Sequence, residues 1–294
     1  MNGNAIEIRG LTKSFKHFKL GPMDLTVPKG AIYGLIGPNA AGKTTTIDLI
    51  MGMGREDAGS IEVFGLDHIK NEVEMKRRIG YVSPDLSYKA WKKVKRLIHF
   101  VRGFYPDWDQ EYCKHLLHKL QIAWNDKITT MSFGSRVKLS LIVALSHRPE
   151  LLLLDEPTLG VDAVSKQQTF SELLAAVRDE EHTVLISSHG LADVERFADH
   201  IGIIKDGQLR LEGPMSDIVD RYRMVDFVHS NGSLPPSMDG FHVQERSGDR
   251  WRVLVDTQSE ANAWLTTHSV RELSSSPVTR SEEHTSELQS LLII

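Results

Sequence analysis

The sequence contains one cysteine, Cys113, among its 294 residues. A single thiol can form neither a disulfide framework nor a cluster of thiolate metal ligands, so a disulfide-stabilised secreted fold and a cysteine-based zinc site are both excluded. The chain also lacks an apolar run approaching the ~18 residues that would span a bilayer, and its first residues lack the basic-then-apolar pattern of a signal peptide. We therefore expect a chain that works in the reducing cytoplasm and depends on other proteins for any role at a membrane.

An excess of positive charge is also missing. The formal net charge is −4, which gives no general electrostatic reason to expect nucleic acid or anionic lipid as the main partner. The exception is the basic run KAWKKVKR at residues 89–96. We interpret it as the solvated face of an amphipathic surface helix that carries Trp91 and Val94 on its apolar side. The alternative is a contact with a partner or with a membrane.

Short apolar segments predict a core of the α/β class. Residues 151–154 (LLLL) are apolar throughout, as expected for a parallel strand that is covered on both faces. Further strands are predicted at residues 6–8, 24–27, 31–36 and 183–186, and a helix at residues 45–53. The strand, glycine-rich turn and helix between residues 31 and 53 follow the order of a phosphate-binding unit. We predict a mostly parallel core sheet.

Two other regions differ in texture from this core. Between residues 87 and 128 the apolar spacing becomes helical, with a break at residues 105–107 (YPD), which predicts a helical insert. After residue 215 strand-like segments, a turn at residues 247–249 and a short helix at residues 260–267 predict a small α+β appendage. The predicted organisation is residues 1–215 as one domain with a helical subdomain at about 87–148, then 216–279 as the appendage. Residues 280–290 (RSEEHTSELQS) look like the in-frame translation of a sequencing-library adapter, so we expect residues 280–294 to be an artefact.

The strongest functional signal is GPNAAGKT at residues 37–44, which satisfies G-x-x-x-x-G-K-[ST] between a predicted strand and a predicted helix. The glycines let backbone N–H groups close around phosphates at a helix N-terminus. Lys43 can reach the β- and γ-phosphates, and the Thr44 hydroxyl can ligate Mg²⁺. The residues predicted to bind the nucleotide here are Gly37, Pro38, Asn39, Ala40, Ala41, Gly42, Lys43, Thr44 and Thr45. We predict ATP and Mg²⁺ as cofactors.

A second signal is LLLLDEP at residues 151–157, an apolar strand that ends in two acids. Side chains at adjacent strand positions diverge, so the two carboxylates can take separate roles. We assign Asp155 to the Mg²⁺ shell and Glu156 to the attacking water. Paired acids at the end of a buried strand are unfavourable unless a cation or a partner offsets their charge.

With these two motifs in place, the sequence resembles the ABC transporter ATPase family over residues 5 to about 215. MSFGS at residues 131–135 stands where the family has its LSGGQ signature, with Ser132 and Gly134 at the matching positions. The resemblance implies that Ser132, at a helix N-terminus, faces the γ-phosphate held by the opposite subunit. It also implies roles for three further residues: Asp162 in the dimer-contact loop TLGVD, His189 in ISSH as the switch histidine, and Phe15 in LTKSF as the aromatic that stacks on adenine.

The resemblance extends to partners and location. The helical insert looks like that of the ATPase subunits of bacterial multidrug, bacitracin or acetoin-type exporters. The family resemblance implies separate membrane-spanning permease subunits and either a homodimer or a heterodimer with a paralogous ATPase. It also implies no nucleic-acid partner and a location on the inner face of the cell membrane. The transported substrate does not follow from it.

The sequence departs from the family at several positions. Members commonly read IGYVPQ where this chain has IGYVSPD at residues 79–85, so the glutamine that senses Mg²⁺ is missing and Asp85 is the candidate to replace it as a metal ligand. Phe133 and Ser135 replace a Gly and the Gln of the signature. Ala40 stands where Gly is usual, and we expect it to be tolerated because a methyl group fits an α-region backbone and strains only a left-handed one.

Two rival functions remain open. A soluble ABC protein of DNA repair or ribosome rescue would usually carry a long coiled-coil insert, zinc-binding cysteines or two cassettes, and this sequence shows one cassette, one cysteine and no heptad run. A catalytically silent cassette is disfavoured by the joint presence of Lys43, Glu156 and His189. We therefore predict an ATP-hydrolysing transporter subunit.

Overall fold

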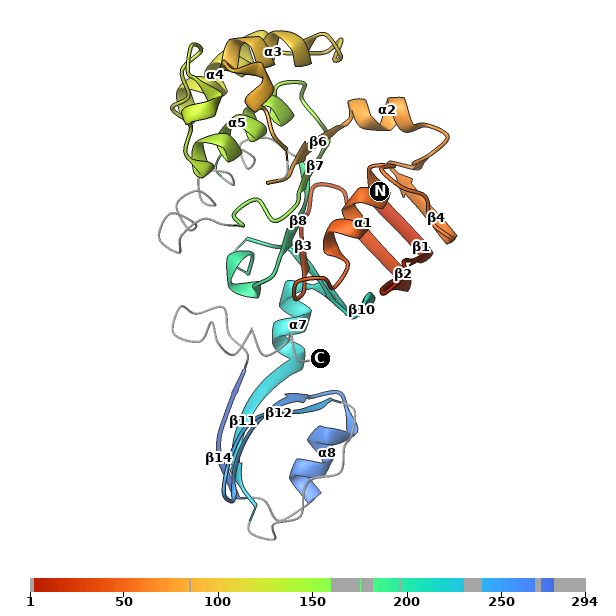
Figure 1. Ribbon diagram of the computed structural model, residues 1–294. Helices are drawn as coiled ribbons and strands as arrows, with labels where there is room; N and C mark the ends of the chain where they lie inside the picture. Colours follow the sequence, from red (N-terminus) through yellow and green to blue (C-terminus); the bar gives the residue numbers. More distant parts are fainter. Residues whose placement is uncertain are drawn as a thin grey trace.

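The computed structural model describes residues 3–84, 86–159, 175, 182–195, 197–229, 240–267 and 271–277. Its central element is a six-stranded sheet in the order β10-β9-β3-β8-β7-β6 (Figure 1). The strands are β3 (Ile32–Ile36), β6 (Ile79–Val82), β7 (Leu151–Leu154), β8 (Thr183–Ser188), β9 (His200–Lys205) and β10 (Gln208–Pro214). Every neighbouring pair is parallel except β9 and β10. The predicted mostly parallel core sheet is confirmed.

A second, antiparallel sheet lies beside the first, and sequence reasoning did not predict it as a separate layer. Its order is β2-β1-β4-β5. The strands are β1 (Asn4–Ser14), β2 (Lys19–Pro28), β4 (Ala58–Val63) and β5 (Leu66–Asp67). Helix α1 (Lys43–Ile50) lies between the two sheets, and its buried Ile47 and Ile50 share one core cluster with Ile8 of β1 and Leu153 of β7 (Figure 1). The predicted helix at residues 45–53 is therefore present, shifted toward the phosphate loop.

Strand β7 explains how one apolar run serves two cores. Leu151 and Leu153 belong to the cluster around α1, whereas Leu152 and Leu154 belong to the cluster on the opposite face of the sheet. This alternation follows from the period of two along a strand. All four side chains are buried, and they fix the strand end that carries the two acids.

The helical insert forms its own layer at the top of Figure 1. It contains the 3₁₀ helices η1 (Lys89–Trp91) and η2 (Ile128–Thr130) and the α-helices α3 (Val94–Arg102), α4 (Gln110–Lys119) and α5 (Phe133–Leu145). Helix α2 (Glu72–Arg77) precedes β6 and lies outside the insert in the sequence. The prediction of one amphipathic helix over the basic run is wrong. Lys92 has a left-handed backbone with φ of 61°, so the run is divided between η1 and the first turn of α3.

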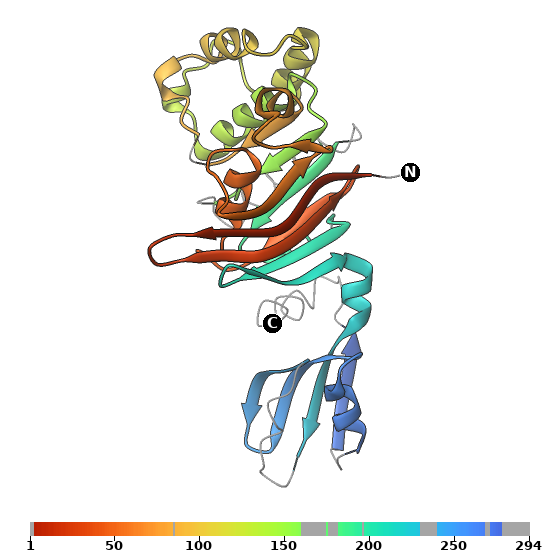
Figure 2. The same ribbon diagram turned by 90° about the vertical axis from the view of Figure 1, so that its right-hand side faces the viewer.

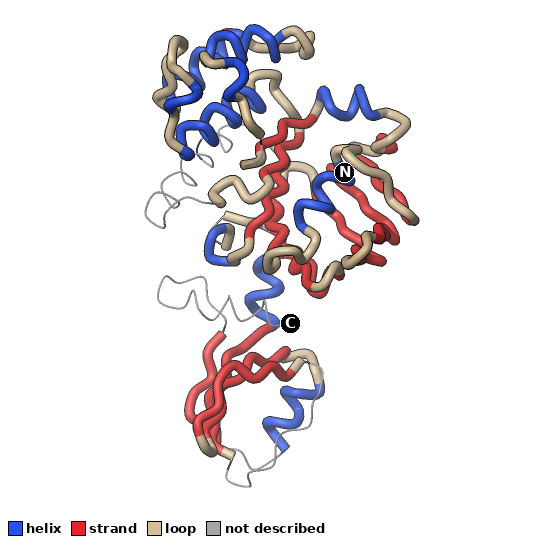
Figure 3. Tube along the Cα trace, viewed as in Figure 1, coloured by secondary structure: helices blue, strands red, loops and turns tan. Residues whose placement is uncertain are grey.

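The C-terminal residues form a four-stranded antiparallel sheet in the order β12-β13-β11-β14, with one helix on one face (Figures 2 and 3). Its elements are β11 (Tyr222–Val228), β12 (Phe241–Ser247), β13 (Arg250–Asp256), α8 (Glu260–Thr267) and β14 (Arg271–Pro277). Strand β14 was missed because its run of three serines lacks apolar alternation. The predicted α+β texture is present, and the adapter-like residues 280–294 lie outside the described residues.

Helix α7 (Met215–Arg221) joins this sheet to the core. Met215 and Ile218 of α7 pack in the same cluster as Ile201 of β9 and Leu254 of β13. The Arg221 guanidinium donates to Asp256 at 3.0 and 2.6 Å. The predicted boundary at residue 215 stays a prediction. Within the described residues, no helix is long and apolar enough to cross a membrane.

Candidate functional site

The loop between β3 and α1 is held by close backbone contacts that side chains would disrupt. A Cβ on Gly37 would lie 2.1 Å from the carbonyl oxygen of Ile204, and one on Gly42, whose φ is 113°, would lie 2.7 Å from Leu20 Cδ1. Ala40 has a φ of 62°. It therefore adopts the left-handed conformation in which its methyl group is strained, by about 1 kcal/mol. Tolerance of Ala40 in a working site stays a prediction.

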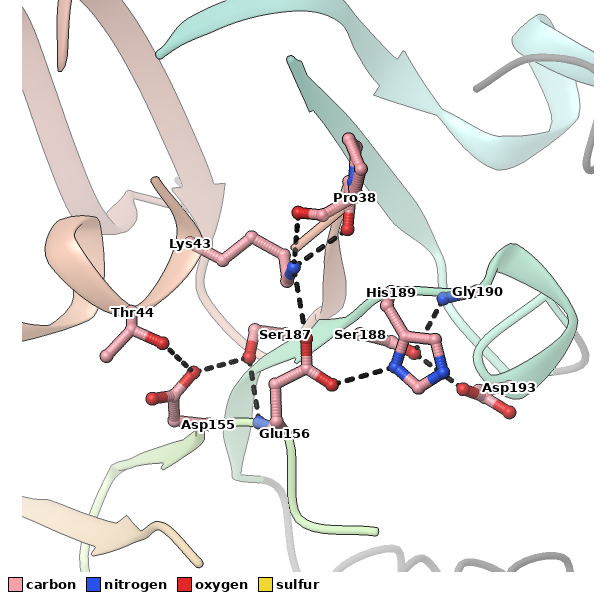
Figure 4. Close-up of polar contacts among 11 residues, drawn as sticks. Pro38, Lys43, Thr44, Asp155, Glu156, Ser187, Ser188, His189, Gly190 and Asp193 are labelled. Atoms are coloured by element: carbon pink, nitrogen blue, oxygen red, sulfur yellow. Dashed lines mark hydrogen bonds and ion pairs between the residues drawn. The ribbon is translucent and has the colours of Figure 1, made fainter. Parts of the chain in front are cut away.

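Lys43, the first residue of α1, points back under this loop and is 4% exposed. Its Nζ donates to the carbonyl oxygens of Gly37 at 2.7 Å and Pro38 at 3.0 Å. The same Nζ lies 3.0 Å from Oε1 of Glu156 (Figure 4). All three ammonium protons thus have partners, two on the phosphate loop and one on the strand-end acid.

Glu156 also contacts His189, through the carboxylate oxygen that does not contact Lys43. The second carboxylate oxygen, Oε2 of Glu156, lies 3.0 Å from Nδ1 of His189. Glu156 is buried, whereas the His189 side chain is 43% exposed. The structure therefore brings together Lys43, Glu156 and His189, which lie on three separate segments, in one chain of contacts (Figure 4).

The other strand-end acid faces the phosphate loop. Oδ1 of Asp155 accepts from the Thr44 hydroxyl at 3.2 Å and from the Ser187 hydroxyl at 2.6 Å. Burial raises the pKa of the Asp155 carboxyl, and the hydrogen bonds from Ser187 and Thr44 oppose that rise. A buried carboxylate beside a hydroxyl oxygen is the donor set that Mg²⁺ prefers, and a cation there would offset the buried charge. The residues present fit this metal.

The signature segment lies at the start of α5. Ser132 caps this helix, and its Oγ accepts from the backbone N–H of Ser135 at 3.2 Å. Gly134 lies in the first turn. Within the described residues, the Ser132 hydroxyl also donates to Oγ of Ser135 at 3.0 Å and makes no hydrogen bond to Lys43 or Glu156.

Three predicted site residues have other outcomes. Phe15 follows β1, is 51% exposed, and has its ring centroid 6.2 Å from that of Phe18, which packs beside Gly42. An exposed ring at this place is available to stack on a flat ligand. Asp85 and Asp162 lie outside the described residues.

Sequence reasoning missed Ser187. Its hydroxyl touches both acids, accepting from the backbone N–H of Glu156 at 2.8 Å besides donating to Asp155. The only signal in the sequence was a pair of serines that ends an apolar strand, and that pattern is common.

The chain resembles known proteins in sequence and in fold. The family model described as ABC transporter matches residues 20–159. The ABC transporter ATP-binding protein YtrB of Bacillus subtilis (strain 168) is 33% identical over 257 residues, covering 87% of this chain and 88% of the relative. The bacitracin transport ATP-binding protein BcrA of Bacillus licheniformis is 32% identical over 221 residues, covering 74% and 72%.

Solved structures show the same fold. An ATP-binding subunit of an ABC transporter superposes with a TM-score of 0.64 at 23% identity, covering 73% of this chain and 91% of that one. A dimeric ATP-binding cassette in a post-hydrolysis state, bound to ADP and Pi, superposes with a TM-score of 0.62 at 18% identity, covering 71% and 98%. Taken with the phosphate loop and its paired acids, these relatives show that the chain belongs to the ABC transporter family, as an ATP-binding and ATP-hydrolysing subunit of such a transporter.

Proposed function

We propose that this chain hydrolyses Mg²⁺-bound ATP at a site completed by a second cassette, and that it thereby drives a separate permease. The observation that carries the proposal is the contact chain from Lys43 through Glu156 to His189. A buried lysine paired with a buried acid contributes little to stability against an apolar alternative, so a chemical role explains its presence better. The ammonium group is already aimed at the loop that would hold phosphates.

In this proposal the phosphate loop, residues 37–45, binds the triphosphate through backbone N–H groups and Lys43, and Phe15 stacks on the adenine. Thr44 and Asp155 hold Mg²⁺, with Asp85 as a further ligand. The metal, when bound, neutralises charge on the phosphate oxygens.

Glu156 acts as the base that takes a proton from the attacking water. Its buried carboxylate lies one residue from the metal ligand Asp155 and is oriented by Lys43 and His189. A phosphate bound by Lys43 competes with Glu156 for the ammonium group, so nucleotide binding would free one carboxylate oxygen for the water. His189, being exposed, can follow the nucleotide while it holds the other oxygen.

The site is completed in trans. Ser132 caps a 13-residue helix whose N-terminus can face an anion, and within the described residues its hydroxyl bonds to Ser135 rather than to Lys43 or Glu156. We propose that Ser132 and Gly134 of one subunit face the ATP held by the other, with Asp162 in the contact between subunits. The dimer is a homodimer or a heterodimer with a paralogue.

The permease would dock on the helical insert. Trp91, Phe100 and Trp124 line a hollow of about 680 Å³ there together with Lys95 and Arg96. Aromatic and cationic walls of this kind fit an amphipathic cytoplasmic segment that carries acidic residues. Such docking would hold the chain on the inner face of the membrane. Co-purification of the permease should be lost in Trp124→Ala.

The test of the catalytic proposal is a phosphate-release assay on the purified chain, with excess Mg²⁺ and with EDTA. Activity should require Mg²⁺ and should be lost in Lys43→Ala. Lys70→Ala, which removes an exposed lysine paired with Asp67, is the matched control and should keep the parental rate. Equal activity in EDTA, or an active Lys43→Ala, would reject the proposal.

A further inference from the structure

Two serine hydroxyls end the buried strand β8 and reach different parts of the site. Ser187 is 0% exposed and Ser188 is 4% exposed. Because side chains alternate along a strand, the two hydroxyls leave it in opposite directions. Ser187 reaches the acids that follow β7 (Figure 4). Ser188 instead donates to Asp193 at 2.6 Å and accepts from the N–H of Gly190 at 3.1 Å, within the loop that carries His189.

The Ser187 hydroxyl is used as donor and acceptor at once. A hydroxyl has one proton to donate and two lone pairs. Its proton goes to Oδ1 of Asp155 at 2.6 Å, and it accepts from the backbone N–H of Glu156 at 2.8 Å. One fully buried group therefore connects the metal-ligand candidate with the candidate base.

The bond to the N–H of Glu156 fixes an unusual backbone. Glu156 has a φ of 43°, in the left-handed region that residues other than glycine seldom adopt. In this conformation its two carboxylate oxygens lie 3.0 Å from Lys43 Nζ and 3.0 Å from His189 Nδ1. Without a partner the buried N–H would be unsatisfied, and the turn would lose the contact that holds it.

The bond to Asp155 fixes the other acid. Both hydrogen bonds that the described residues give to this carboxylate, from Thr44 and from Ser187, end on Oδ1. Oδ2 is thereby left for a metal ion. Thr44 would itself turn to the metal, so the bond from Ser187 is the one that can persist in the loaded site.

We propose that Ser187 is a positioning residue for both acids. Its hydroxyl orients the Asp155 carboxylate for Mg²⁺, and it holds Glu156 in the backbone conformation that places the carboxylate oxygens beside Lys43 and His189. The proposal rests on the roles given above to Asp155 and Glu156. Loss of a group that orients a metal ligand typically lowers metal affinity or activity by about 10- to 100-fold.

The experiment measures metal binding directly, by titrating the ATP complexes of the full chain with Mn²⁺ and following free Mn²⁺ by electron paramagnetic resonance. Ser187→Ala should weaken Mn²⁺ binding by about 10- to 100-fold, while ATP binding without metal stays within about twofold. Ser187→Thr, which keeps the hydroxyl, should restore the parental Mn²⁺ affinity. Ser188→Ala, the matched control, removes the hydroxyl of the next residue and should leave Mn²⁺ affinity within about twofold of the parent.

Three results would overturn the proposal: parental Mn²⁺ affinity in Ser187→Ala, equal weakening in Ser187→Ala and Ser188→Ala, or no recovery in Ser187→Thr. Should Ser187→Ala not fold, Ser187→Cys retains a weak donor of similar size and should give a smaller shift in the same direction. Failure of the underlying function would look different, because ATP with the parental chain would then bind Mn²⁺ no more tightly than ATP alone, and the chain would release no phosphate.

Discussion

Replacing Glu156 by glutamine should separate ATP binding from ATP hydrolysis. Glutamine keeps the size and one oxygen, which can still accept from Lys43, but it cannot take a proton from water. A positioned general base contributes about 10²- to 10⁴-fold to a rate, which corresponds to about 2.7–5.4 kcal/mol of activation free energy. Phosphate release should fall by that factor.

The same substitution should strengthen ATP binding. The Lys43 ammonium and the Glu156 carboxylate lie 3.0 Å apart with side chains 4% and 10% exposed. Their attraction is on the order of 5 kcal/mol at an effective dielectric constant of about 20, and desolvation offsets most of it. In Glu156→Gln the ATP phosphates no longer compete with a carboxylate for the Lys43 ammonium group. ATP should therefore bind about tenfold more tightly in the absence of Mg²⁺, a gain of about 1.4 kcal/mol. Lys43 keeps its bonds to the loop carbonyls, so the loop should keep its shape.

The assay pairs phosphate release with fluorescent-nucleotide binding and with size-exclusion chromatography in ATP, where Glu156→Gln should run as a trapped dimer. Glu150→Gln is the control: it makes the same chemical change just before the other end of β7, where Glu150 pairs with Arg78 on the surface. It should behave like the parent. A Glu156→Gln protein that hydrolyses ATP at the parental rate would refute the assignment of the base.

Three further predictions follow from individual residues. Because burial raises the pKa of Asp155, its charged form opposes folding at neutral pH. Asp155→Asn should therefore raise the melting temperature at pH 7, and this gain should shrink as the pH falls through the raised pKa. The same substitution should remove Mg²⁺-dependent activity. An equal or larger gain at low pH would contradict the sign. Ala40→Gly relieves a left-handed alanine and should raise stability by up to about 1 kcal/mol in chemical denaturation, without lowering activity; a clear loss of stability would show that the loop is not strained there. A chain that ends at Thr279 should match the full chain in melting temperature and phosphate release, and a genomic read that encodes the adapter-like residues would remove the reason for expecting this.

The site loop and three strands of the central sheet, β3, β7 and β8, could be predicted because their signals are local, whereas β6, β9 and β10 were not predicted. Leu151–Leu154 is an uninterrupted apolar run, and the phosphate loop has its own pattern of glycines with Lys43 at the end. The strand-end acids follow directly from that run. His189 was predicted from the family resemblance, and its contact with Glu156 depends on how β7 and β8 pair in the sheet.

The missed features depend on backbone conformation or on distant partners. Lys92 divides the basic run through a left-handed backbone, although lysine carries no sequence signal for one. For Ala40 the sequence did not decide between an α-region and a left-handed conformation, and the residue is left-handed. Ser187 gained its importance only when β8 placed it beside the acids of β7. Such contacts join residues more than 30 positions apart, beyond the reach of periodicity.

The central claim, that two subunits share each ATP, is tested most directly by mixing two inactive variants. Lys43→Ala damages the phosphate loop and Ser132→Arg damages the helix N-terminus, so each homodimer should be inactive. A mixed dimer, isolated through two different affinity tags, places both lesions in one site and leaves the other site with an intact Lys43 and an intact Ser132. Phosphate release or ATP-driven dimerisation should return in that mixed dimer. If both residues served one site within a single subunit, every site would carry a lesion, and verified mixed dimers with no recovery would contradict the account.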